Sequence, residues 1–215
     1  MNRLRDALVR YVEEHTSTDA AHDLGHLNRV WRNATLIADR EAPCDRTVLL
    51  AAAYLHDLVN LPKSHLDRAK ASLLSAEKST PLLRDLGLRA DQIDATCHAI
   101  IAHSFSANVP PETLEARILQ DADRIEALGA IGLARCFAIS GALSRPLFHF
   151  ADPFAVSRPR DDQTYAVDHF AEKLLRLPAT MQTAAGRELA NERAGVLRRY
   201  LDDLATELDV PVSGW

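Results

Sequence analysis

Apolar residues recur every three or four positions along most of this chain, which is the spacing of one face of an α-helix. The C-terminal run is a clear case, with leucines at positions 197, 201, 204 and 208. No segment alternates convincingly with period two, and long β-branched runs bounded by turn residues are missing. The pattern therefore predicts an all-α fold. The expected helices span residues 2–15, 20–41, 46–60, 65–77, 79–86, 90–105, 111–127, 128–141, 162–177 and 186–208. Asp45 precedes the third of these and is expected to cap its N-terminus.

A length of 215 residues is typical of one domain with a full hydrophobic core. We expect a single domain over residues 1–215, with its core at about 20–140 and a C-terminal helical extension at about 160–210. The least regular segment, residues 144–162, holds three prolines and several aromatic residues. It is either a loop that covers something or an ordinary surface connection.

Charge and cysteine content exclude several classes of protein. The net charge of −5 leaves no basic footprint for duplex nucleic acid or an anionic membrane. The three cysteines are widely spaced, which is neither a disulfide framework nor a CxxC metal site. No stretch of 18 apolar residues appears, and the first helix lacks the apolar core of a signal peptide. We expect a cytoplasmic protein without a membrane or duplex nucleic-acid partner; the oligomeric state stays open, because an amphipathic helix does not distinguish core from interface.

The segment AAAYLHDLVN, residues 51–60, places His56 and Asp57 within an apolar run. Burying an ionised carboxylate is costly unless something pairs with it. Neighbouring side chains on a helix point about 100° apart, so the two could straddle one small cation beside the helix. Imidazole nitrogen and carboxylate oxygen form a mixed donor set that suits Mn, Fe, Zn or Co. The alternative is a His–Asp pair at the solvent end of a helix, in contact with water or a lysine.

Four blocks of sequence, taken together and in order, resemble the HD superfamily of metal-dependent phosphohydrolases. They are HDLGHLNRVWRNA, AAAYLHDLVN, AIIAHSFS and ILQDADRIEALGAIGLARCF, and residues 168–197 resemble the C-terminal region of one subgroup. The resemblance covers roughly residues 20–200 and is closest to small bacterial HD hydrolases that act on nucleoside triphosphates. It implies an HD-domain helical bundle with additional C-terminal helices.

Carried over by position, the resemblance implies that His26, His56, Asp57 and Asp123 bind a divalent metal ion. The segment QDAD also offers Asp121, and both acids flank the apolar stripe of their helix at similar angles, so periodicity does not decide between them. The ADR context resembles the last-ligand motif of the superfamily and favours Asp123, with Asp121 as a supporting acid. The implied metal is Mn²⁺, with Fe²⁺, Ni²⁺, Co²⁺, Zn²⁺ or Mg²⁺ as alternatives.

Three further residues are candidates for acid–base chemistry. His22 and Asp23 precede the first implied ligand, and His103 lies in AIIAHSFS, where it is expected to face the substrate. His22 could equally be a polar residue at a helix start. Some superfamily members hold a second metal with two more histidines, here His98 and His103, but we favour one metal and an ordinary structural role for His98.

Phosphate recognition needs positive charge and hydrogen-bond donors. The candidates are Lys63 and Arg68, which follow the HD pair, Arg124, which follows the last implied ligand, and Lys173, which matches a recurrent position of the subgroup. Each could equally lie on a solvated helix face.

The resemblance implies hydrolysis of nucleoside triphosphates, especially deoxynucleotides, to a monophosphate and pyrophosphate. The alternatives are a nucleoside monophosphatase, a cyclic-nucleotide phosphodiesterase, a non-catalytic nucleotide sensor, or a purely structural helical domain. Hydrolases of (p)ppGpp carry an acidic pair after the HD helix, which the segment NLPK at residues 60–63 lacks. That substrate is therefore ranked lower.

Overall fold

The computed structural model describes residues 1–15, 23–61, 65 and 67–211. The regular secondary structure of these residues consists of α-helices and short 3₁₀ segments, and no strand occurs among them, which confirms the predicted all-α class. The α-helices are α1 (Asn2–His15), α2 (Leu24–Ala38), α3 (Arg46–Leu55), α4 (Ala71–Asp85), α5 (Ala90–His103), α6 (Leu114–Ile125), α7 (Gly129–Ala142), α8 (Asp168–Glu172) and α9 (Ala184–Leu208). The 3₁₀ segments are η1 (Arg68–Lys70), η2 (Phe105–Ala107) and η3 (Leu174–Thr180).

The chain divides into two compact units, residues 1–123 and 124–215. The expectation of a single domain over the whole length stays a prediction, and each unit is described by itself.

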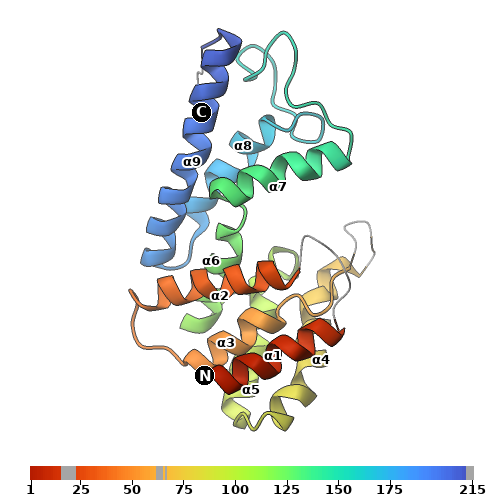
Figure 1. The fold of residues 1–215 in the computed structure, drawn as a ribbon, viewed down its shortest axis with the longest axis vertical. Coiled ribbons are helices and arrows are strands. Elements are labelled where there is room, and N and C mark those ends of the chain that lie inside the picture. The colour runs from red at the N-terminus through yellow and green to blue at the C-terminus, as the bar shows by residue number, and fades with distance from the viewer. Residues whose placement is uncertain (16–22, 62–64, 66, 212–215) are drawn as a thin grey trace. The chain divides into compact units, whose positions relative to one another are not determined.

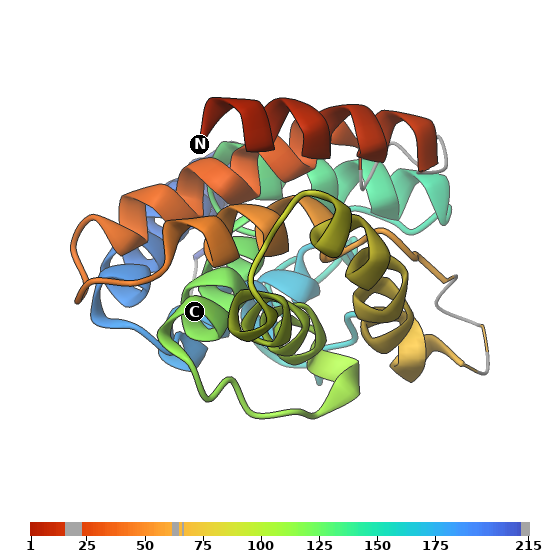
Figure 2. The same ribbon diagram turned by 90° about the horizontal axis from the view of Figure 1, so that it is seen from below.

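Helix α3 is the centre of the first unit. Asp45 caps its N-terminus by accepting hydrogen bonds from the backbone amides of Thr47 and Val48, at 2.8 and 3.3 Å, as its sequence position predicts. Every residue from Val48 to Leu55 is buried. Helices α1, α2, α4 and α5 all contact α3, and α1, α2 and α3 lie side by side (Figures 1 and 2). An apolar helix surrounded in this way carries the HD pair at its C-terminal end.

Helix α3 ends at Leu55, with His56 as its C-cap, so the prediction of a helix to residue 60 is wrong. The reason is a tertiary contact: the hydroxyl of Ser75 accepts a hydrogen bond from the amide of Val59 at 3.0 Å and holds the chain in a turn. His56 and Asp57 therefore lie just beyond the helix, where adjacent side chains are not restricted to the 100° separation of helical residues.

Helix α4 replaces two predicted helices, 65–77 and 79–86, and runs through Pro81 without a break. Proline inside a helix removes one backbone donor and is unfavourable by propensity. Here the packing of α4 against α5 outweighs that preference: α4 buries a row of small and apolar side chains. The row consists of Ser72, Ser75, Ala76, Ser79 and Leu83.

In the second unit, α7 and η3 pack against the long helix α9 (Figure 1). Leu197, Leu201 and Leu204 are buried, as their periodicity predicts. The helix predicted over residues 162–177 is instead the short α8 followed by η3.

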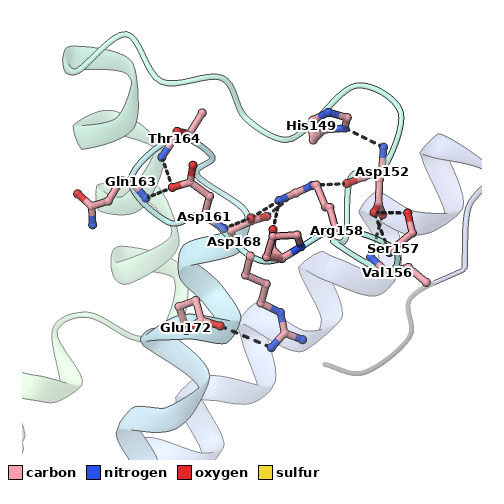
Figure 3. Close-up of polar contacts among 12 residues, drawn as sticks. His149, Asp152, Val156, Ser157, Arg158, Asp161, Gln163, Thr164, Asp168 and Glu172 are labelled. Atoms are coloured by element: carbon pink, nitrogen blue, oxygen red, sulfur yellow. Dashed lines mark hydrogen bonds and ion pairs between the residues drawn. The ribbon is translucent and has the colours of Figure 1, made fainter.

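A buried charge pair connects the irregular segment before α8 to that helix, as Figure 3 shows. Asp168 is fully buried and accepts hydrogen bonds from both terminal nitrogens of Arg158, at 2.6 and 2.8 Å, and from the amide of Asp161 at 2.7 Å. The guanidinium of Arg158 also lies 4.6 Å from the ring centroid of Tyr165. This segment is therefore tied to the helical part of its own unit by a charged side chain.

Across the described part of the chain, no single helix is long and apolar enough to cross a membrane, and α6 and α7 pass that test only as a bent pair, by length and composition.

Candidate metal centre

His26 lies in the first turn of α2, where the local sequence fixes the helix start. The carboxylate of Asp23 accepts a hydrogen bond from the backbone amide of His26 at 2.8 Å and so caps the helix. The His26 side chain is buried, and its Nε2 atom lies 3.8 Å from Oδ2 of Asp57 and 3.5 Å from Oδ1 of Asp123. One imidazole from the start of α2 therefore meets two carboxylates from elsewhere in the first unit.

His56 is buried and its tautomer is set by the backbone. Its Nδ1 atom lies 3.0 Å from the carbonyl oxygen of Ala53, which can only accept, so Nδ1 carries the hydrogen. Its Nε2 atom lies 3.5 Å from Oδ2 of Asp57 and 3.9 Å from Oδ1 of Asp123, and it has no hydrogen-bond partner among the described residues. Burial lowers the pKa of His56 to about 4, against the opposing effect of Asp57. The ring is thus neutral at pH 7, with a lone pair on Nε2 directed at two carboxylates.

Asp57 lies in the turn after α3, and two side chains hold that turn. Ser75 binds the amide of Val59, and Nη1 of Arg68 donates to Oδ1 of Asn60 at 2.8 Å and also to the carbonyl of Leu61. The predicted phosphate ligand Arg68 therefore has a structural contact in the turn beside the cluster.

The structure separates the two acids of QDAD, which periodicity could not do. The Oδ1 atom of Asp123 lies within 3.9 Å of the Nε2 atoms of both His26 and His56. Asp121 is fully buried and is not part of either group of side chains that could hold a metal. Of the two acids, Asp123 is the one that α6 presents to the histidines.

His103, the last residue of α5, also belongs to the cluster. Its Nε2 atom lies 3.6 Å from Oδ1 of Asp57, and its ring packs edge-on against His56 with the centroids 4.8 Å apart. Burial works to lower the pKa of His103, but the interaction with Asp57 and the charge of Asp123 outweigh burial and raise the pKa. His98 lies elsewhere and accepts a hydrogen bond from the amide of Glu112 at 3.0 Å.

Two overlapping groups have their potential ligand atoms within 4.8 Å of one another: one is His26, His56 and Asp123, and the other is His56, Asp57 and His103. Imidazole nitrogens and carboxylate oxygens are ligands for first-row divalent metals. The neutral, buried Nε2 of His56 is what a metal ligand requires, since a protonated imidazole cannot coordinate. The residues present therefore fit a divalent cation.

The histidines of the cluster are buried, whereas its carboxylates are partly exposed to solvent. The side chains of His26 and His56 are 2% and 0% exposed, whereas those of Asp57 and Asp123 are 21% and 31% exposed. Solvent and a ligand therefore have access from the side of the carboxylates.

The remaining predicted residues are His22, Lys63, Arg124 and Lys173. His22 and Lys63 lie outside the described residues. Arg124 belongs to the second unit, where its Nη1 atom donates to the carbonyl of Thr180 at 2.9 Å. Lys173 is an exposed residue at the C-cap of α8. The phosphate-binding roles of Lys63, Arg68, Arg124 and Lys173 and the catalytic role of His22 stay predictions.

Sequence reasoning missed three polar residues that hold the chain around the cluster: Ser75, Asn33 and Gln120. Asn33 and Gln120 are buried amides, and each bonds to a backbone carbonyl on another helix. A polar residue on the apolar face of a predicted helix was the available signal. Such a residue can be recognised as buried from the sequence, but its partner cannot.

The cap of α2 leads to a stability prediction. Replacing Asp23 with alanine removes the acceptor for the His26 amide and is expected to lower the free energy of unfolding by about 1 kcal/mol. Asp23→Ser keeps a capping oxygen and is expected to restore most of that loss in urea denaturation. The serine variant also separates two roles: wild-type stability with lost activity would support the predicted catalytic role, and retained activity would contradict it.

Comparison with known proteins places the chain in a family. Residues 23–128 match the family model for the HD domain. Protein YpgQ of Bacillus subtilis is 32% identical over 200 residues, which cover 91% of this chain and 88% of YpgQ. The crystal structure of YpgQ in complex with ADP has a TM-score of 0.74 and 31% identity, over 97% of this chain and 96% of that one. An HD-superfamily hydrolase from Bacillus thuringiensis has a TM-score of 0.76 and 28% identity, over 98% and 99% of the two chains.

The matched region contains every residue of the His–Asp cluster, and the relatives share the helical fold over nearly their whole length. The protein therefore belongs to the HD superfamily of metal-dependent phosphohydrolases.

Proposed function

We propose that His26, His56, Asp57 and Asp123 bind one divalent cation, which is Mn²⁺ in the active enzyme. The proposed reaction is hydrolysis of nucleoside triphosphates to a monophosphate and pyrophosphate. The observation that carries the proposal is the convergence of two imidazole nitrogens and two carboxylate oxygens, with N···O distances of 3.5–3.9 Å. A nucleotide substrate is supported by the relative YpgQ, whose structure was solved with ADP.

Such a cation supplies Lewis acidity toward a phosphoryl oxygen and toward the attacking water. The residues of the chain would orient the ligand atoms and balance the charge of the cation. The hydrogen bond from Nδ1 of His56 to Ala53 orients the ring and leaves the Nε2 lone pair directed at the cation. Asp57 and Asp123 offset the cation's charge, and their exposed side leaves room for the phosphate chain and the water.

His103 is the best-placed candidate for proton transfer. Its Nδ1 atom lies 2.5 Å from the carbonyl of Ile100, so Nε2 is the atom turned toward Asp57. A proton held at Nε2 can pass to a phosphoryl oxygen or leaving group beside the carboxylates. Lys63, Arg68 and Arg124, which follow proposed ligands in the sequence, and Lys173, which matches a recurrent position of the subgroup, are proposed to neutralise phosphate charge.

A substrate panel with Mn²⁺ tests this proposal. We expect equimolar monophosphate and pyrophosphate from deoxynucleoside triphosphates, identified by chromatography, and no release of free phosphate. The panel includes nucleoside triphosphates, monophosphates, cyclic nucleotides and (p)ppGpp.

Two bridged analogues locate the broken bond. A β,γ-methylene deoxynucleotide should still be cleaved, because its α–β bridge is an ordinary anhydride, whereas the α,β-methylene analogue should only inhibit. Free phosphate from monophosphates would replace this proposal with a nucleotidase. Nucleotide binding without turnover of any panel member would replace it with a sensor.

A further inference from the structure

Two buried amide side chains link the helices that carry the cluster. Asn33 on α2 donates from Nδ2 to the carbonyl oxygen of Ala122 on α6, at 3.3 Å. Gln120 on α6 donates from Nε2 to the carbonyl oxygen of Ala102 on α5, at 2.7 Å. The two side chains are 2% and 4% exposed. Because a carbonyl oxygen only accepts, the amide nitrogen must face it in both cases.

Each of the two carbonyl groups belongs to the residue directly before a cluster residue. Ala122 directly precedes Asp123, and Ala102 directly precedes His103. Asn33 follows His26 by seven residues on α2, and two helical turns return to the same face within about 20°. Each hydrogen bond therefore joins one cluster-bearing helix to the backbone next to a cluster residue on another.

Stability alone accounts poorly for this arrangement. A buried amide loses its hydration on folding, and each end of the group needs a partner to offset that loss. The Oε1 atom of Gln120 is buried and has no hydrogen-bond partner among the described residues. An apolar side chain of similar volume would fill the same space without that cost.

We propose that Asn33 and Gln120 are positioning residues, which set the spacing of α2, α5 and α6 so that His26 and Asp123 reach one cation and His103 reaches Asp57 beside it. This inference rests on the proposed ligands. A cation needs nitrogen and oxygen ligands at about 2.0–2.2 Å, so a small displacement of one helix removes a ligand from reach. Groups that orient metal ligands typically change metal affinity about 10–100-fold when they are replaced.

Apolar replacements of similar size test the proposal: Asn33→Leu and Gln120→Met. The matched control is Gln92→Met, because Gln92 is also a buried amide on α5 that joins two helices, through Nε2 to the carboxylate of Asp45 at 2.8 Å. Its contact lies at the N-terminal ends of α3 and α5, whereas His56 and His103 lie at their C-terminal ends. The control therefore removes a comparable link far from the cluster.

Calorimetric titration of the metal-free protein with Mn²⁺ gives the main readout, and the visible spectrum of the Co²⁺ form reports ligand geometry. We expect Asn33→Leu and Gln120→Met to weaken Mn²⁺ binding by about tenfold or more and to alter the Co²⁺ spectrum. Gln92→Met should leave both unchanged, even where its melting temperature falls further than those of the other two.

Asn33→Ser keeps a donor in a smaller side chain and should retain more affinity than the leucine variant; it also serves if the leucine variant does not fold. Wild-type Mn²⁺ affinity and Co²⁺ spectrum in both test variants would overturn the positioning role. Mn²⁺ binding by Asp57→Ala shows whether the positioning role alone has failed or the ligand assignment as well. If Asp57→Ala lowers Mn²⁺ affinity and the amide variants do not, the positioning role alone fails; if Asp57→Ala also binds normally, the ligand assignment fails with it.

Discussion

Asp57→Ala is expected to lose more than about a hundredfold in turnover, since even residues that only orient a metal ligand cost 10–100-fold when they are removed. Asp57 contacts three histidines: its Oδ2 lies 3.8 Å from His26 and 3.5 Å from His56, and its Oδ1 lies 3.6 Å from His103. The substitution removes one anionic ligand of the proposed site and the partner of the proposed proton carrier. Steady-state hydrolysis of a deoxynucleoside triphosphate with Mn²⁺ measures the loss.

Thermal unfolding distinguishes loss of the metal from loss of the fold. A cation at 100 times its dissociation constant stabilises the folded protein by about 2.7 kcal/mol. Wild type should therefore melt at a higher temperature with Mn²⁺ than with a chelator, and Asp57→Ala should melt at the same temperature in both.

The control for Asp57 is Asp39→Ala. Asp39 is an exposed acid whose carboxylate pairs with Arg46 at 2.7 Å, and an exposed ion pair contributes at most about 1 kcal/mol. This variant should keep both its turnover and its response to Mn²⁺. Normal turnover in Asp57→Ala would refute the metal site as proposed.

Arg158→Met is expected to destabilise the protein by about 3–5 kcal/mol, because it leaves a buried carboxylate without its compensating charge. Asp168 is 0% exposed, and Arg158 supplies two of the hydrogen bonds that it accepts (Figure 3). The substitution also removes the contact of the Arg158 guanidinium with the ring of Tyr165. Urea denaturation followed by circular dichroism measures the change in the free energy of unfolding.

Two variants test the cause of that loss. The double replacement Arg158→Met with Asp168→Leu removes both charges and should recover much of the stability, since replacing a buried ion pair by apolar residues is often neutral or better. Arg176→Ala breaks an exposed ion pair with Glu172, at 3.1 Å in the same unit, and should cost less than about 1 kcal/mol. A loss below about 1 kcal/mol in Arg158→Met would mean that the Arg158–Asp168 pair contributes no more than an exposed ion pair.

The sequence by itself determined the helical class, because a 3.6-residue apolar period needs no knowledge of which helix packs against which. It also singled out His56 and Asp57, since a charged pair within an apolar run needs compensation wherever that run is buried. The remaining ligand candidates came from the order of motifs in a related family. Asp45 was recognisable as a helix cap because capping depends only on neighbouring residues.

Helical periodicity left open which of two acids meets the histidines; the family resemblance favoured Asp123, and the tertiary structure shows the contact. Periodicity describes angles around one helix axis, and Asp121 and Asp123 are nearly equivalent by that measure. Which of them reaches His26 depends on how α2 and α6 cross, and that crossing is set by contacts distant in sequence such as Asn33 with Ala122. The end of α3 at Leu55 has the same kind of cause, because Ser75, from another helix, holds the turn that carries Asp57.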